Sequence, residues 1–142
     1  MSGRSAKVTQ SWWLGLMFID ILTGCQRPTA KDAVRQALVD TVGINVVDCG
    51  RSAIDDSRFA QRDCVFDSHR DRKPFIVLFE VAGKEGELYE EGLAGDSSGG
   101  VYTLEIASGD NFRKGGHLAP RACPTPPKLE VVGNGVVSCS WK

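Results

Sequence analysis

Apolar residues recur at helical spacing between residues 30 and 42 of the 142-residue chain. The apolar positions are Ala30, Ala33, Val34, Ala37, Leu38 and Val42. Thr29 and Asp32 fit a capping box, and Gly43 stands where a left-handed C-cap residue is expected. The pattern predicts an amphipathic helix. We expect it to pack on the domain's own core, because its polar face is not rich in Lys or Arg and its apolar face has no aromatic residue.

A second helical pattern runs from about Asp56 to Ser68, with Asp55 or Asp56 as the expected N-cap. Its apolar side is expected to hold Phe59, Ala60, Cys64 and Phe66, and its charged side to hold Arg58 and Arg62. The β-branched run from Ile44 to Val47 comes before this helix and predicts an edge strand or an extended lead-in.

The pattern changes from helical to extended after Pro74. Phe75 to Phe79 is apolar at every position, which predicts a strand buried on both faces. Turn residues at 83–86 and 96–100 separate this strand from extended segments at 88–93 and 101–106. Three strands joined by short turns predict an antiparallel meander.

The remaining chain predicts one long loop and one hairpin. Residues 107–117 form the longest irregular segment, and the prolines that follow Cys123 favour an extended crossing. Residues 129–132 and 136–141 flank Gly133, Asn134 and Gly135, which is a strong hairpin signal. The whole pattern predicts an α+β fold: one or two helices packed on an antiparallel sheet of four to five strands, with two disulfides.

The N-terminal residues have the pattern of an export signal. Arg4 and Lys7 precede residues 12–22, which are apolar apart from Asp20. This run is too short to cross a hydrocarbon core, which needs roughly 20 apolar residues. The charge of Asp20 opposes insertion by on the order of 2.5–3.5 kcal/mol. The run ends in Leu22, Thr23, Gly24 and Cys25, which resembles the lipobox of bacterial lipoproteins.

The resemblance implies that cleavage removes residues 1–24 and that lipid on Cys25 anchors the protein to a membrane. Residues 25–28 would then be a spacer, and residues 29–142 a single domain. Gln26 follows the cysteine where aspartate would favour the inner membrane under the family's sorting rule. The resemblance therefore implies the outer membrane, with the domain facing the periplasm or the cell exterior.

The charge balance excludes one class of partner. The 118 residues from Cys25 onward carry 15 basic and 17 acidic side chains. A nucleic-acid-binding domain is expected to be basic, so we expect no nucleic-acid partner.

Four cysteines remain once Cys25 is assigned to lipid: Cys49, Cys64, Cys123 and Cys139. An even number in an oxidising compartment predicts two disulfides. Three pairings are possible. The sequence-local one, Cys49 with Cys64 and Cys123 with Cys139, is favoured because each loop closes within one supersecondary unit. A zinc site is disfavoured, since no Cys-x-x-Cys pair or nearby histidine is present.

The region after the spacer also resembles small uncharacterised bacterial extracytoplasmic proteins with two disulfides. The matching positions are Cys49 with Gly50, Cys64, Pro74 with Phe75, Gly83, Gly100 to Tyr102, Cys123 with Pro124, and Cys139. This resemblance implies no specific activity.

Candidate catalytic residues do not form a recognisable set in the sequence. Residues 95–100 superficially resemble the nucleophile loop of trypsin-like serine proteases, but a triad also needs an oriented histidine, and nothing marks His69 or His117. The acidic residues Glu85, Glu87, Glu90 and Glu91 are interpreted as a solvated edge whose charges discourage strand pairing. We expect no cofactor and no metal site.

The expected function is that of a lipid-anchored, non-enzymatic binding or envelope-interaction module. Its expected partners are the membrane, through Cys25, and an envelope protein. The alternative is a small periplasmic enzyme or enzyme inhibitor that uses loop 107–117 or turn 96–100.

Overall fold

The computed structural model describes residues 29–107 and 118–141, and these form an α+β fold. The helices are α1 (Ala30–Val42) and α2 (Phe59–Arg70). The strands are β1 (Val47–Ser52), β2 (Phe75–Ala82), β3 (Leu88–Gly95), β4 (Val101–Ala107), β5 (Arg121–Ala122), β6 (Leu129–Val132) and β7 (Val136–Cys139). A five-stranded sheet has the order β1-β2-β3-β4-β5, and β6 and β7 form a separate two-stranded sheet. Within the described ranges, no helix is long and apolar enough to span a membrane.

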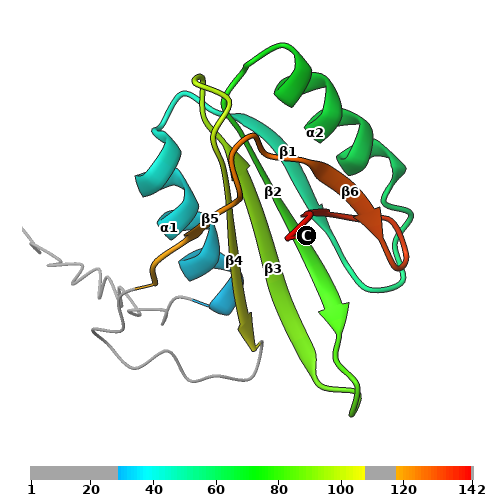
Figure 1. Ribbon diagram of the computed structural model, residues 1–142. Helices are drawn as coiled ribbons and strands as arrows, with labels where there is room; N and C mark the ends of the chain where they lie inside the picture. The colour runs from blue at the N-terminus through cyan, green and yellow to red at the C-terminus, as the bar shows by residue number, and fades with distance from the viewer. Residues whose placement is uncertain (1–28, 108–117, 142) are drawn as a thin grey trace, which may run out of the picture.

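Helix α1 packs on one face of the five-stranded sheet (Figure 1). Thr29 and Asp32 form the predicted capping box, and Gly43 is the C-cap with a φ of 100°. Val34 and Leu38 are fully buried against strand residues that include Ile76 and Leu78. The packing is closest at Gly92 of β3, where a Cβ atom would lie 2.6 Å from side-chain carbons of both helix residues.

Helix α2 and the β6–β7 hairpin cover the opposite face (Figure 1). Their apolar residues pack with Phe75, Val77, Phe79 and Leu93 in a second buried cluster. The disulfides have the predicted local pairing, because Cys49 is bonded to Cys64 and Cys123 to Cys139. The first joins β1 to α2, and the second joins the segment after β5 to β7.

Strand β2 is the buried central strand that its uniform apolar pattern predicts. Phe75, Val77 and Phe79 face α2, whereas Ile76 and Leu78 face α1. The sheet is mixed rather than wholly antiparallel, because β1 runs parallel to β2. Since α2 connects these two strands, the chain returns to the same end of the sheet before β2 begins. β1 also begins at Val47, where the predicted strand ended.

Helix α2 differs from its predicted orientation. It begins at Phe59 after Arg58, which makes no side-chain capping bond, while Asp56 accepts a hydrogen bond from the Ala53 amide instead. Phe59 is 64% exposed and Arg58 only 5% exposed, the reverse of the predicted sides. The reason lies outside the helix, because Arg58 Nη2 donates to the Glu80 carbonyl oxygen on β2 at 2.5 Å.

The interpretation of Glu90 and Glu91 as a solvated edge is wrong. Strand β3 lies between β2 and β4, so these consecutive residues point to opposite faces of a central strand. Glu90 is 2% exposed and bonds to Arg51 of β1 through Nε at 2.7 Å and Nη2 at 3.0 Å. A bulge at Gly50, which has a φ of 84°, shifts the register so that Arg51 reaches this face.

Candidate functional site

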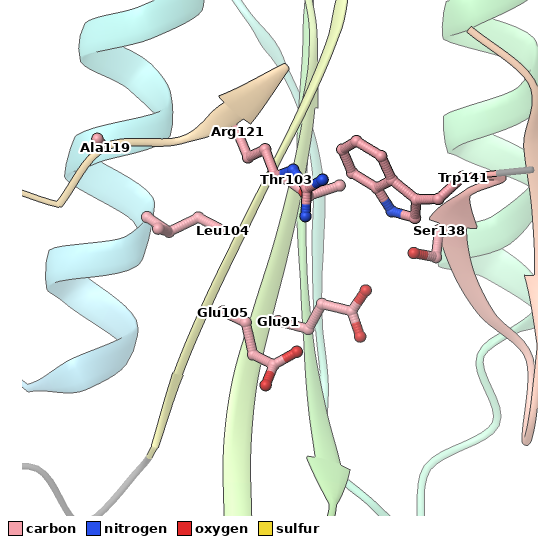
Figure 2. Close-up of a pocket in the computed structure, with 8 residues that line it drawn as sticks. All are labelled: Glu91, Thr103, Leu104, Glu105, Ala119, Arg121, Ser138 and Trp141. Carbon is pink, nitrogen blue, oxygen red and sulfur yellow. The ribbon is translucent and has the colours of Figure 1, made fainter. Parts of the chain in front are cut away.

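A cavity of about 370 Å³ lies beside the sheet on the face shared with α2 and the β6–β7 hairpin. Strand register builds its sheet wall. Glu91 of β3 is directly opposite Glu105 of β4, and Thr103 of β4 is directly opposite Arg121 of β5. Because alternate residues of a strand share a face, these four side chains lie on one surface. Figure 2 shows Ser138 and Trp141 across from them; Ser138 lies on β7, and Trp141 follows the C-terminal end of that strand.

Glu91 is the least exposed acid in this cavity. Burial raises the pKa of its carboxyl group above the ordinary value, a hydrogen bond with Ser138 opposes that shift, and the charge of Glu105 raises the pKa further. The charge of the Arg58 guanidinium lowers it. A carboxyl group with a perturbed pKa in a cavity marks a candidate functional site.

The acidic pair is not neutralised by an ion pair. Neither Glu91 nor Glu105 forms a salt bridge with a described Arg, Lys or His. Like charges placed directly opposite each other on neighbouring strands destabilise a sheet. The arrangement therefore lowers the stability of the domain when both groups are ionised.

Trp141 forms the wall that faces the strands. Its ring is stacked under the Arg121 guanidinium, whose central carbon is 3.9 Å from the ring centroid, and the residue is 44% exposed. An exposed tryptophan beside carboxylates and hydroxyls suits a site that binds a flat or cationic group. The short strand β5 and the disulfide between Cys123 and Cys139 bring Arg121 and Trp141 together.

A second cavity, of about 330 Å³, adjoins the first through Glu91, which lines both. Arg58 lines it together with mostly apolar residues, among them Ile54, Val81 and Val132. Arg58 Nε is buried and has no hydrogen-bond partner. We call the two cavities together the Glu91 groove. It combines two carboxylates, a buried guanidinium with spare donor capacity, and an exposed aromatic ring.

The sites considered from the sequence lie elsewhere. In turn 96–100, Asp96 accepts hydrogen bonds from the amides of Ser98 and Gly100 and from the hydroxyls of Ser98 and Tyr102. These bonds describe a closed turn in which Asp96 binds its own loop. His69 lies in the last turn of α2 and, among the described residues, makes no side-chain hydrogen bond to this turn.

Two predictions fall on residues that the structure does not describe. Cys25 lies before the first described residue, and His117 lies with most of loop 107–117 in the gap between residues 107 and 118. Within residues 29–107 and 118–141, no three His, Cys, Asp or Glu side chains are grouped as a metal site would require.

The sequence analysis did not identify the Glu91 groove, although the sequence contained part of the pattern that predicts it. A hairpin turn at 96–100 pairs residues equidistant from Ser98, and this pairing places Glu91 opposite Glu105. Nothing local indicated that Arg121 and Trp141 would face this pair. No protein-family model, curated protein or solved structure matches the chain.

Proposed function

We propose that this protein is a lipid-anchored extracytoplasmic lipoprotein, tethered through Cys25 to the outer membrane, whose domain acts as a non-enzymatic binding module. The lipobox-like sequence from Leu22 to Cys25 supports the anchor. The two disulfides support export, because such bonds persist in oxidising compartments. Four peptide units separate Cys25 from Thr29, so an extended spacer would hold the domain within about 14 Å of the lipidated residue.

The observation that carries the binding role is the Glu91 groove. Its two cavities lie within the roughly 300–1,000 Å³ range of small-ligand sites, and they combine apolar walls with a few polar groups. Its paired carboxylates lower stability and are not neutralised by a described ion pair. Groups that lower stability yet line an open cavity favour a ligand-binding role over a structural one.

The enzyme alternative has less support from the same geometry. A carboxyl group with a raised pKa next to an ionised one could serve in acid–base catalysis. Glycoside hydrolysis, however, requires two carboxyl groups that flank the scissile bond. Glu91 and Glu105 are neighbours on one sheet face, so both would approach a bound sugar from the same side.

Metabolic labelling with a radioactive fatty acid in a bacterial host tests the anchor. The wild-type protein should take up label and fractionate with the outer membrane, and Cys25→Ala should take up none. Cys49→Ala/Cys64→Ala is the matched control, because it also removes cysteine sulfur but leaves the lipobox unchanged. An unlabelled wild-type protein would refute the lipoprotein assignment.

A further inference from the structure

Two pairs of glutamates lie back to back in the sheet. Glu80 is directly opposite Glu90 on the α1 face, and Glu91 is directly opposite Glu105 on the other face. Each pair places two carboxylates directly opposite each other on neighbouring strands, so the same like-charge repulsion acts in both pairs. The surroundings of the two pairs can therefore be compared directly.

The guanidinium of Arg51 bridges the first pair. Arg51 binds Glu90 with two hydrogen bonds and reaches Glu80 Oε1 from Nη2 at 3.1 Å. A planar guanidinium suits such a bridge, since its fork of donors matches two carboxylate oxygens. The pair on the α1 face thus shows what kind of group satisfies two opposed glutamates in this sheet.

The second pair has an open cavity where the first has Arg51. Two described cations line the two cavities. Arg121 is stacked on Trp141, and Arg58, whose charge also lowers the pKa of Glu91, donates to the Glu80 carbonyl. The cavity of about 370 Å³ has room for a guanidinium or ammonium group beside the carboxylates. Thr103 also lines it, and its methyl group offers contact surface for an alkyl stem.

Arg58 supplies an independent indication of a ligand. It is 95% buried, lines the adjoining cavity, and its Nε lacks a hydrogen-bond partner. An unsatisfied buried donor is costly. Because Nε is shielded from the cavity, a ligand oxygen would satisfy it only by drawing the guanidinium toward the cavity. The two cavities together would then suit a ligand with a cationic group at one end and an acceptor oxygen at the other.

We propose that the Glu91 groove binds an arginine or lysine side chain presented by a peptide segment of an envelope protein, with the cation between Glu91 and Glu105 and a peptide carbonyl oxygen facing Arg58. This inference rests on the proposed binding function and specifies its ligand. The Trp141 ring forms the outer wall. Among the described residues that line the first cavity, Arg121 is the cation that opposes the incoming charge.

The test is a titration of the full-length protein in detergent micelles with N-acetyl-arginine amide. The indole N–H resonance of Trp141 reports on the groove. N-acetyl-citrulline amide is the neutral isostere, and butylguanidine carries the guanidinium without a peptide carbonyl or a second charge. We expect the arginine amide to shift the resonance, the citrulline amide to bind at least tenfold more weakly, and butylguanidine to bind more weakly than the arginine amide.

Variants test whether binding of the arginine amide depends on the acidic pair. Glu105→Gln should weaken binding of the arginine amide about tenfold, and Arg121→Gln should strengthen it. Glu85→Gln removes the same charge from an exposed turn outside the groove and should change nothing. Because Glu105 is exposed, its variant is expected to fold, and thermal unfolding checks this directly.

Three outcomes would overturn the inference. The first is equal binding of the citrulline and arginine amides, and the second is an unchanged affinity in Glu105→Gln. The third is tighter binding of butylguanidine than of the arginine amide, which would show that no peptide carbonyl contributes to recognition. In each case a ligand still occupies the groove, so the binding function stands. If none of the probes, nor a set of acidic and neutral peptides and sugars, shifts the Trp141 resonance, the binding function fails as well.

Discussion

Replacing Glu105 with glutamine should make the domain more stable while it weakens ligand binding. Glu105 and Glu91 are directly opposite on neighbouring strands, a geometry that places Cβ atoms about 5 Å apart. Cross-strand pair energies are about 0.2–1 kcal/mol, and like charges directly opposite each other are destabilising. Incomplete ionisation of Glu91 and screening by salt reduce this value, so we expect a gain of about 0.5 kcal/mol.

The assay is urea unfolding of the oxidised protein, followed by circular dichroism. A gain of about 0.5 kcal/mol corresponds to a rise in Tm of about 2 °C for a domain of this size. The gain should shrink in high salt, because the repulsion is screened. Glu85→Gln is the control and should leave the midpoint unchanged. A Glu105→Gln variant that is less stable than the wild type would refute the reasoning, since it would show that Glu105 makes a stabilising contact.

The pH dependence of stability tests whether the pKa of Glu91 is raised in the folded protein. The pKa of Glu91 is raised in the folded state, so folding binds protons near the ordinary titration range of a carboxyl group, and stability falls as pH rises through the folded pKa. The stability that Glu91→Gln gains over the wild type should therefore be small below pH 4.5, the ordinary pKa of a glutamate, and should grow above it. The groups that set this dependence are Glu105 on β4, Arg58 before α2 and the Ser138 hydroxyl on β7. A gain that does not vary with pH would contradict a perturbed Glu91.

Three further substitutions test the packing around the groove. Arg51→Met should cost about 2–3 kcal/mol in urea unfolding, below the 3–5 kcal/mol of a fully buried pair because Arg51 is partly exposed; a loss under 0.5 kcal/mol would contradict the bridge. Gly92→Ala should cost about 1–3 kcal/mol, since its Cβ would meet Leu38 at 2.6 Å, and an unchanged midpoint would show that α1 moves away freely. Cys49→Ala/Cys64→Ala should cost about 3 kcal/mol, the value expected for a loop with a sequence separation of 15, and an equally stable variant would show that β1 and α2 stay docked without the bond.

Several features were predictable because their causes are local in the chain. Thr29 and Asp32 cap α1 through groups three residues apart, and Gly43 ends it through its own backbone freedom. The uniform apolar run of β2 could be removed from water only if other elements packed on both faces of the strand. The disulfides followed the same logic, since each joins cysteines that neighbouring elements bring together.

Other features depended on which elements meet in space. No local signal makes β1 parallel to β2, because strand direction follows from the path of α2 between them. Arg58 belongs to the charged side of a helical pattern, but the Glu80 carbonyl draws it into the interior. Glu90 belongs to a segment whose polar composition is typical of an exposed strand. The bulge at Gly50 nevertheless brings Arg51 to Glu90, and this ion pair permits the burial of Glu90.

The sequence by itself determined α1, the apolar central strand and the three hairpin turns, and it favoured the disulfide pairing that is found, because capping, turn and loop-closure energies act over short stretches of chain. Only the tertiary structure decided that β3 lies inside the sheet and that Arg121 and Trp141 face Glu91 and Glu105. Whether a charged side chain lies at the surface or in the interior depends on the groups that pair with it, and those groups come from distant parts of the chain. The Glu91 groove is therefore a property of the fold, even though each residue that lines it has an ordinary place in the sequence.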